Sequence, residues 1–209
     1  MIEGQSLYYQ YADGKGIQFP DFSFQQGSQW LILGPSGSGK TTLLQLLAGL
    51  RKPSKGSLSM HGKRIDQYSA SELDSHRGAE IGIVFQKGQF VNALSVGENL
   101  LLSQYLGGKK QDAKLCRDMI ASLGLADKWG KKLRSLSQGE RQRISLARAL
   151  VKSPKVILAD EPSSALDDEN TEKVVELIKT HAKKVGATLI IVTHDQRLKD
   201  NFQHKIELT

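Results

Sequence analysis

The chain has 209 residues, 39% of them hydrophobic, and a formal net charge of +7. These values exclude an intrinsically disordered chain, because the apolar residues suffice for a core, and the length fits one large domain. The longest apolar runs, at 43–50 and 188–192, are far shorter than the roughly 18 residues of a membrane span. Cys116 is the single cysteine, and the first residues show neither a basic leader nor an apolar signal core. We therefore expect a cytosolic protein without an internal disulfide.

Positive charge gathers between residues 101 and 150, a segment that we call the basic lobe. Lys and Arg far outnumber Asp and Glu in this segment. A solvated helical surface explains such an excess, and so would contact with anionic lipid headgroups, with an acidic partner loop or with nucleic acid. Because aromatic residues are not interleaved with these charges, a groove for single-stranded nucleic acid is disfavoured.

The pattern of apolar residues predicts strands that alternate with helices. Residues 2–24 and 57–60 read as short strands with turn residues, which we expect to form an antiparallel sheet. A short apolar strand is predicted at 29–34, a leucine-rich helix at 40–50 and a further buried strand at 81–86. The residues between 86 and 137 read as mainly helical, with breaks at Gly107, Gly108 and Gly124.

The second half of the chain continues the alternation. A helix is predicted at 137–151, a buried strand at 156–160, a helix at 168–185 that ends at Gly186, and a strand at 187–193. Continuous apolar strands that alternate with helices are typical of a parallel sheet. We therefore predict an α/β fold in a single domain over residues 1–209, with an antiparallel β-subdomain and a helical subdomain inserted at about residues 87–150.

A glycine-rich loop, GPSGSGKT at 34–41, lies between a predicted strand and a predicted helix. It matches the phosphate-loop pattern G-x-x-x-x-G-K-[ST] at every defined position. Its glycines let backbone amides approach phosphate oxygens, Lys40 would reach the terminal phosphates, and the Thr41 hydroxyl would bind Mg²⁺. The sequence therefore predicts a P-loop NTPase core. The residues expected to hold the nucleotide are Gly34, Pro35, Ser36, Gly37, Ser38, Gly39, Lys40, Thr41 and Thr42.

Two acids, Asp160 and Glu161, end the apolar strand predicted at 156–160. At the carboxyl edge of a parallel sheet, Asp160 would hold Mg²⁺ beside the phosphates, and Glu161 would polarise the attacking water. Paired acids at a strand end can also be solvated loop residues. The apolar strand before them and Pro162 after them favour the nucleotide site.

The pentapeptide LSQGE at 136–140 opens the helix predicted at 137–151. Ser137, followed three residues later by Glu140, forms a capping-box pattern. A capped helix start also offers a hydroxyl and free backbone amides to an anion, so the two interpretations are compatible. Together with the phosphate loop and the acidic strand end, the pentapeptide predicts a second surface that clamps a nucleotide from its far side.

With these motifs, the chain resembles the nucleotide-binding subunit of an ATP-binding cassette (ABC) transporter over essentially its whole length. The phosphate loop corresponds to the family's Walker A motif, Gln86 to its Q-loop glutamine and the pentapeptide to its signature. Residues 156–160 correspond to Walker B, with Glu161 as the catalytic glutamate. Residues 164–167 correspond to the D-loop and His194 to the switch histidine. The motifs occur in the family's order, which makes the resemblance specific.

The resemblance implies roles for the remaining residues. Gln86 would sense the γ-phosphate or Mg²⁺, and His194 would hold the water and Glu161 in line. Tyr11 would stack on adenine, although Tyr8 and Tyr9 compete and tyrosines in a strand are usually packing residues. The implied catalytic set is Glu161, His194, Gln86 and Lys40, and the implied metal ligands are Thr41, Gln86 and Asp160. The implied nucleotide contacts beyond the phosphate loop are Tyr11, Ser137, Gln138, Gly139, Glu140 and Asp167.

The same resemblance implies the reaction and the partners. The chain would be an ATPase that uses ATP and Mg²⁺, and two copies would sandwich ATP head to tail as a homodimer, so that Ser137 and Gly139 act on the ATP of the other subunit. Dimer closure would power a separate integral membrane permease. The chain would reach the cytoplasmic face of the inner membrane only through that permease, and no nucleic-acid partner is expected.

Two features depart from the family pattern. The signature usually reads LSGGQ, whereas Gln138 and Glu140 stand in this chain. Gln138 adds a side chain where backbone approaches phosphate, so weaker or slower dimer closure is expected. Few residues follow His194, and we expect no regulatory domain after them.

The branch within the family is less sharply indicated. Residues 69–86 and 94–102 and the run after the signature resemble lipoprotein-releasing, macrolide-export and cell-division ATPases, whereas DEPSSALD at 160–167 is closer to importers of polar amino acids. We favour the first group. A regulatory ATPase bound to signalling membrane proteins is the main alternative. A DNA-repair or ribosome-associated cassette usually carries long coiled coils or tandem cassettes, and a small-molecule kinase would leave the pentapeptide and His194 unexplained.

Overall fold

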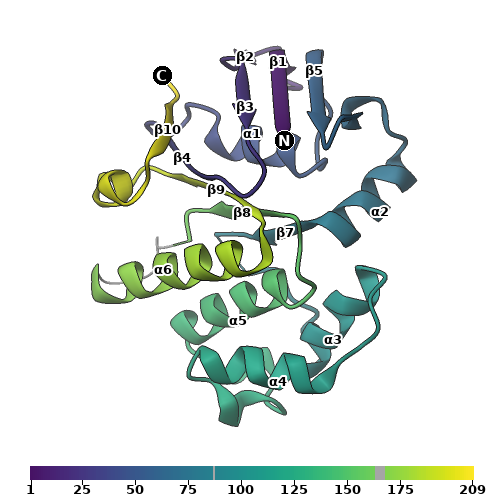
Figure 1. Ribbon diagram of the computed structural model, residues 1–209, viewed down its shortest axis with the longest axis vertical. Helices are drawn as coiled ribbons and strands as arrows, with labels where there is room; N and C mark the ends of the chain where they lie inside the picture. Colours follow the sequence, from purple (N-terminus) through teal and green to yellow (C-terminus); the bar gives the residue numbers. More distant parts are fainter. Residues whose placement is uncertain (87, 163–167) are drawn as a thin grey trace.

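A parallel sheet forms the centre of the fold in the computed structural model, which describes residues 1–86, 88–162 and 168–209. Its strand order is β10-β4-β9-β8-β7, and every neighbouring pair is parallel (Figure 1). The order is not sequential, because helical crossovers connect parallel strands. The strands are β4 (Gln29–Leu33), β7 (Ile81–Val84), β8 (Val156–Asp160), β9 (Thr188–Thr193) and β10 (His204–Glu207).

The two faces of this sheet belong to different hydrophobic cores. Side chains alternate along a strand, so Ile32 and Leu158 point to one face, where they pack with helix α1 (Lys40–Leu47) and with the second sheet. Leu31 and Ile157 point to the other face, where helices α5 (Gln138–Leu150) and α6 (Asp168–Val185) cover the sheet (Figure 1). Burial on both faces explains why β8 and β9 are apolar between their end residues.

An antiparallel sheet lies beside the parallel one, as the sequence predicted. Its central strand, β1, pairs antiparallel with β2, β3 and β5, which are labelled in Figure 1. Strand β5 also pairs antiparallel with β6. Phe22 and Phe24 alternate with an exposed serine in β3, so that both rings face the core. The strands are β1 (Ile2–Gln10), β2 (Gly16–Gln18), β3 (Phe22–Phe24), β5 (Lys55–Met60) and β6 (Lys63–Arg64).

A helical insert joins β7 to β8, as the resemblance implied. Helices α3 (Val96–Leu106) and α4 (Ala113–Ser122) pack against α5 on the side of the parallel sheet that faces away from the antiparallel sheet (Figure 1). Helix α2 (Ala70–Glu80) precedes β7. Short 3₁₀ turns complete the described chain: η1 (Ile65–Gln67), η2 (Ala126–Lys128), η3 (Leu133–Ser135) and η4 (Gln196–Asn201). Within the described ranges, no helix combines the length and the apolar character needed to cross a bilayer.

Several element bounds differ from the sequence prediction for identifiable reasons. Helix α1 ends three residues early, because Gly49 adopts φ 63° and Leu50 N–H donates back to the Gln45 carbonyl, which closes a Schellman motif. Strand β7 stops at Val84, two residues before the predicted end. Strand β10 was not predicted, because most of its residues are exposed at the sheet edge and show no apolar pattern.

Candidate functional site

The predicted site residues come together at one edge of the parallel sheet. The phosphate loop leaves the carboxyl end of β4, Asp160 ends β8, and Thr193 ends β9. Strand β9 lies between β4 and β8, with Leu33 opposite Thr193 and Asp160 opposite Val192. Parallel register therefore places three loops side by side, which is the usual position of a ligand site in an open α/β sheet.

The phosphate loop has the backbone geometry of an anion cradle. Gly37 adopts φ +87° with open space around it, a conformation that other residues rarely adopt. Gly34 lies so close to the Leu208 carbonyl that an added Cβ would come within 2.5 Å of it. The Ser38 hydroxyl is buried and has no hydrogen-bond partner among the described residues. An unsatisfied buried hydroxyl in this loop fits a ligand with acceptor oxygens.

Lys40 lies at the start of α1 and is buried beneath the loop. Its ammonium donates hydrogen bonds to the carbonyls of Gly34 and Pro35, at 2.7 and 2.8 Å. The charge is therefore folded against the loop that a phosphate would occupy. Gly39 caps α1 with φ 87°, so the free amides of the first helical turn face the same loop.

Thr41 and Asp160 bring a hydroxyl and a carboxylate together across two elements. The Thr41 hydroxyl donates to Asp160 Oδ1 at 3.3 Å. Burial raises the pKa of Asp160, and the neighbouring Glu161 adds to this effect, whereas the Thr41 hydrogen bond and Lys40 oppose it. A cation beside the carboxylate would relieve the cost of burying its charge. Hydroxyl and carboxylate oxygens are also the donor set that Mg²⁺ prefers, so these residues fit that ion.

Glu161 is held firmly by the end of β9. The Thr193 hydroxyl donates to Oε2 at 2.7 Å, the His194 backbone N–H donates to Oε1 at 3.0 Å, and His194 Nδ1 lies 2.8 Å from Oε1. The Glu161 backbone adopts φ 48°, an uncommon conformation for a residue with a Cβ. The Glu161 side chain is only 11% exposed, whereas that of His194 is 64% exposed. His194 therefore closes over the carboxylate from the solvent side.

Gln86 and Tyr11 are carried by different sheets, Gln86 after β7 and Tyr11 after β1. Gln86 is exposed two residues beyond β7, and no hydrogen bond joins its side chain to another described residue. Tyr11 lies just after β1, outside the strand, and its hydroxyl is 2.6 Å from the Thr42 hydroxyl on α1. Tyr8 and Tyr9 lie within β1. Of these three tyrosines, Tyr11 is therefore the one that lies outside the strand, and its hydroxyl contacts α1.

The signature residues form the capped start of α5. Ser137 is the N-cap, and its hydroxyl accepts from the Glu140 N–H at 3.2 Å while the Glu140 carboxylate accepts from the Ser137 N–H at 2.7 Å. These contacts, together with an ion pair to Lys128 at 3.2 Å, lower the pKa of Glu140. Ser137 and Gln138 are exposed and Gly139 is partly exposed. Within the described ranges no hydrogen bond joins them to the phosphate loop, and Asp167 with the rest of the D-loop lies outside those ranges.

Sequence reasoning missed two contacts that organise the site. Thr193 orients Glu161 and also accepts from the Asp195 N–H at 3.0 Å. The buried Gln142 of α5 donates to the Pro162 carbonyl at 3.2 Å, which ties the signature helix to the loop after Glu161. A polar residue at a strand end signals the first contact. The second has no sequence signal, because it depends on how α5 packs against the parallel sheet, where it contacts β7.

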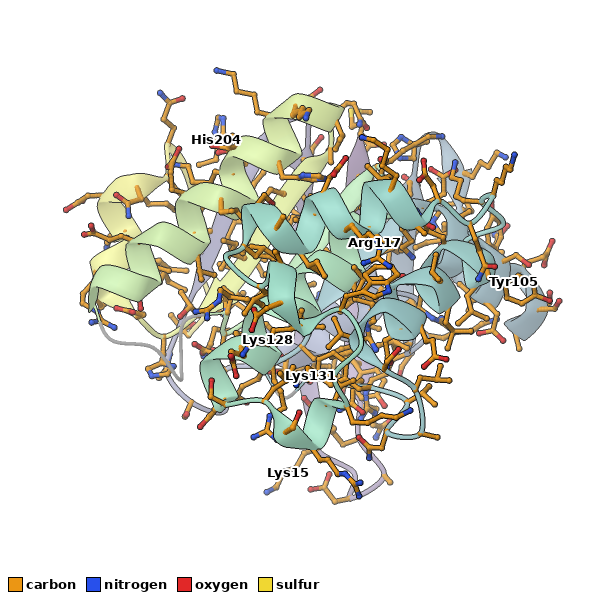
Figure 2. The ribbon with its side chains drawn as sticks, turned by 90° about the horizontal axis from the view of Figure 1, so that it is seen from below. Lys15, Tyr105, Arg117, Lys128, Lys131 and His204 are labelled. Atoms are coloured by element: carbon orange, nitrogen blue, oxygen red, sulfur yellow. The ribbon has the colours of Figure 1, made fainter. Side chains whose placement is uncertain are left out.

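The basic lobe is mostly a solvated surface, with some of its charges paired. Lys114 pairs with Asp118 one helical turn away at 2.9 Å. Arg117 covers the Trp129 ring, with 4.1 Å between the guanidinium carbon and the ring centroid, and Figure 2 shows both Arg117 and Lys128 on this side of the molecule. The one tryptophan in the lobe is therefore occupied by a cation of the same chain.

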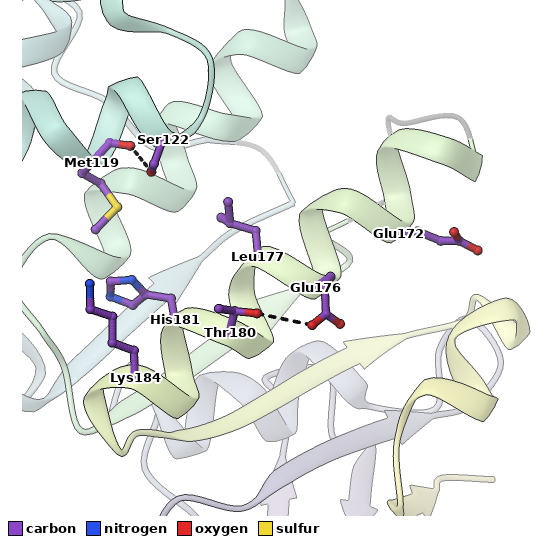
Figure 3. A pocket seen from close by; sticks show the side chains of 8 residues that line it. All are labelled: Met119, Ser122, Glu172, Glu176, Leu177, Thr180, His181 and Lys184. Carbon is purple, nitrogen blue, oxygen red and sulfur yellow. Dashed lines mark hydrogen bonds between the residues drawn. The ribbon is translucent and has the colours of Figure 1, made fainter.

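A groove of about 630 Å³ lies on the outer side of the helices, away from these motifs. It opens between α4 and α6, where Met119, Leu177 and His181 line its walls (Figure 3). None of the predicted site residues lines it. The chemistry indicated by the motifs therefore belongs to the carboxyl edge of the sheet rather than to this groove.

Comparisons with known proteins agree with the motifs and the fold. The ABC transporter family model matches residues 17–164. The lipoprotein-releasing system ATP-binding protein LolD of Bacteroides thetaiotaomicron is 36% identical over 200 residues, covering 93% of this chain and 90% of that protein. The macrolide export ATP-binding/permease protein MacB of Rhodopseudomonas palustris is 35% identical over 99% of this chain, which spans 32% of that protein.

A solved structure has the same arrangement of elements. It is the dimeric post-hydrolysis state of the ATP-binding cassette MJ0796 bound to ADP and Pi, with a TM-score of 0.89 and 30% identity, covering 100% of this chain and 94% of that one. The family model, the relatives and the fold thus converge with the motifs read from the sequence. This chain belongs to the ABC transporter family, as an ATP-binding subunit that hydrolyses ATP.

Proposed function

We propose that this chain powers a separate membrane permease by ATP-driven closure of a head-to-tail homodimer, in a system of the export or lipoprotein-release type. The observation that carries the ATPase part is the presence, beside the phosphate loop, of two hydrogen-bonded pairs, Thr41 with Asp160 and His194 with Glu161. The branch is supported by relatives named LolD, which match over nearly their whole length. The dimer is supported by the dimeric MJ0796 structure.

The residues of this chain divide the work of hydrolysis. The phosphate loop binds the triphosphate through its backbone amides and through the side chains of Ser38 and Lys40. To reach the terminal phosphates, the Lys40 ammonium leaves the carbonyls to which it now donates. Glu161 accepts the proton of the attacking water, and His194 and Thr193 hold the carboxylate in position while it does so. Positioning and electrostatics carry most of the catalysis in phosphoryl transfer, and these residues supply both.

Mg²⁺ fits the pair formed by Thr41 and Asp160, with Gln86 as a further ligand. When bound, the ion would neutralise charge on the phosphate oxygens. Asp160 and Thr41 already lie within hydrogen-bond distance of each other. The exposed Gln86 follows β7, at the same edge of the sheet, where its side chain is free to turn toward the site.

The capped start of α5 completes the site of the second copy. Ser137 and Gly139 present a hydroxyl and backbone amides at the surface, and Glu140 is kept occupied by the capping box and Lys128. A surface helix start of this kind favours an anion. Each copy would thus contribute the phosphate loop to one ATP and the signature to the other. Asp167 would join this interface.

A second groove offers a docking surface for the permease. It has a volume of about 640 Å³ and lies between α2, β7, α3 and the end of α5. Arg77, Arg148 and Lys152 line it, and Asp74 is the only acid among the described residues that do. Val91 and Leu106, which are exposed apolar side chains, also line it, and Tyr105 stands beside Leu106 at the edge of the molecule (Figure 2). Apolar and cationic surface together fit a partly apolar permease segment that carries a carboxylate.

Reconstitution tests the transporter role directly. The chain is purified with the membrane protein that copurifies with it, and the pair is placed in lipid vesicles. We expect ATPase activity to rise when a lipoprotein or another transported solute is supplied, because cargo would bias the closed dimer. A regulatory ATPase would bind the membrane protein but show no stimulation by any cargo, and no movement of cargo. That outcome would favour the cell-division-like alternative and leave the ATPase assignment intact.

A further inference from the structure

The hydroxyl of Tyr11 is bonded to the helix that follows the phosphate loop. Tyr11 lies in the turn after β1, where its backbone N–H donates to the Lys15 carbonyl at 2.7 Å and its carbonyl accepts from the Gly14 N–H at 3.1 Å. The Tyr11 hydroxyl lies 2.6 Å from Thr42 Oγ1. Thr42 is buried in the first turn of α1. The ring is therefore fixed both through its backbone and through its hydroxyl.

A second contact to α1 supports the same ring. The Tyr9 ring meets the Tyr11 ring edge to face, with 5.1 Å between centroids and 84° between planes. Arg51 lies over the Tyr9 ring at 5.1 Å, hydrogen-bonds the Tyr9 hydroxyl, and also hydrogen-bonds Gln45 on α1. Two separate chains of contacts thus connect the Tyr11 ring to α1, one through Thr42 and one through Tyr9 and Arg51.

We propose that the Thr42 hydroxyl is a positioning residue for Tyr11, and that it sets the aromatic platform for the nucleotide base at a fixed distance from the phosphate loop. The inference rests on the proposed contact of Tyr11 with adenine. Helix α1 carries the phosphate loop at its start and Thr42 one residue beyond Thr41, so a ring bonded to Thr42 moves with the phosphate site. Holding both ends of the nucleotide site on one rigid element reduces the entropy lost when ATP binds.

This role differs from two simpler ones. If Thr42 acted on the phosphates, its loss would weaken any triphosphate, with or without a base. If Tyr11 acted only through the area of its ring, its hydroxyl would be dispensable. The proposed bond predicts instead that removing either hydroxyl weakens binding of ATP more than binding of a triphosphate without a base.

The test measures binding of ATP and of inorganic tripolyphosphate to four variants of the full chain, by isothermal titration calorimetry. Tyr11→Phe and Thr42→Val each remove one hydroxyl of the bond, and the double variant removes both. Tyr8→Phe is the matched control, because it removes a hydroxyl from a neighbouring tyrosine whose ring lies under Lys55 rather than against α1.

We expect Tyr11→Phe and Thr42→Val each to weaken ATP binding by about 2- to 10-fold, the usual effect of one lost hydrogen bond. The double variant should be no weaker than Thr42→Val alone, since both hydroxyls belong to the same bond. Tyr11→Phe should leave tripolyphosphate affinity unchanged, Thr42→Val should weaken tripolyphosphate less than ATP, and Tyr8→Phe should bind both ligands like the unaltered chain. Thermal unfolding of each variant checks that the fold is kept, and Tyr11→Phe, at a half-buried position, stays informative if Thr42→Val is destabilised.

Three results would overturn the inference. Tyr11→Phe binding ATP normally would show that the hydroxyl has no part in positioning. Thr42→Val weakening tripolyphosphate as much as ATP would assign Thr42 to the phosphates. Additive losses in the double variant would show that the two hydroxyls act separately. The proposed transport function survives all three, because it does not depend on how the base platform is held.

Discussion

At the scale of single residues, the carboxylate of Glu161 is the group whose surroundings are most specialised. It is almost fully buried, accepts from Thr193 and His194, and stands on a backbone with φ 48°. Such a conformation costs of the order of 1–3 kcal/mol and persists where surrounding contacts over-determine it. Strain and occupied oxygens together indicate a side chain that is selected for its position rather than for stability.

We predict that Glu161→Gln binds ATP but hydrolyses it roughly 10²- to 10⁴-fold more slowly, because the amide keeps the shape and loses the basicity. ATP binding by calorimetry and phosphate release at saturating ATP measure the two effects. Glu172→Gln, the same change at an exposed position on α6, is the control and should behave like the unaltered chain. Near-normal phosphate release by Glu161→Gln would refute the role of this residue as the base.

Lys40→Ala should instead weaken nucleotide binding itself, because the variant loses the positive charge beside the phosphates.

At the scale of elements, the end of α5 connects the site to the groove proposed for the permease. The helix carries the signature at its start and Arg148 in its last turn. Lys152 follows, and its ammonium donates to the carbonyls of Arg77 and Gly78 at 3.0 and 2.6 Å. Burial, with smaller effects of Arg148 and Arg77, lowers the pKa of Lys152 to about 8. A half-buried lysine beside two arginines gains from a carboxylate supplied by a partner.

We predict a pH dependence of permease binding from this lysine. A partner carboxylate would favour the charged form of Lys152 and raise the pKa of this residue in the complex. At a pH where Lys152 is neutral in the free chain, binding would therefore be accompanied by uptake of a proton. The contribution of Lys152 to affinity is then complete below its free pKa of about 8 and declines as the pH rises above that value. Affinity for the purified permease, measured at about pH 7 and about pH 9.5, should be weaker at the higher pH.

The control for this effect is Lys152→Arg, which stays protonated over the whole range and should remove the pH dependence while keeping the affinity. Lys152→Met should bind weakly at both values. ATPase activity of the isolated chain should be similar in all three, because Lys152 lies outside the catalytic and nucleotide-binding residues. Equal pH dependence in Lys152→Arg would show that another group titrates, and would remove Lys152 from the docking surface.

At the scale of the whole molecule, the phosphate loop and the signature do not meet through a hydrogen bond among the described residues of one chain. The phosphate loop gathers Lys40, Thr41 and Asp160, whereas Ser137 lies exposed at the start of α5 without a bond to that loop among the described residues. A head-to-tail pair would bring the loop of one copy to the signature of the other. Hydrolysis would then belong to the dimer.

Mixing two inactive variants tests this arrangement. Lys40→Ala disables the phosphate loop, and Ser137→Asp keeps a good N-cap while adding a negative charge that repels the triphosphate. We predict that each variant alone is inactive and that an equal mixture recovers about a quarter of normal activity, because half the dimers are mixed and each contains one intact site. Phosphate release measures the recovery. A mixture as inactive as its components would exclude shared sites, and an active Ser137→Asp would exclude the signature contact.

The amino-acid sequence alone determined the identity and order of the elements that carry the motifs. The capping box at Ser137 and Glu140 formed as predicted, because N-cap contacts involve residues three positions apart and depend on little else. Helix α6 spans the predicted residues and ends before Gly186, which adopts φ 65°. The strands at Val156–Asp160 and Gln29–Leu33 were predicted nearly to the residue, since burial on both faces leaves an unbroken apolar run.

Only the tertiary structure decided which residues meet. Three hydrogen bonds of the site join positions far apart in the chain: Thr41 with Asp160, Thr193 with Glu161, and Tyr11 with Thr42. Strand order and register set these contacts, and neither is encoded in a local pattern. Strand β10 illustrates the same limit, because an exposed edge strand is defined by its partner rather than by its own composition. The chemistry of the chain is thus readable from short-range patterns, whereas its assembly depends on long-range packing that no single segment specifies.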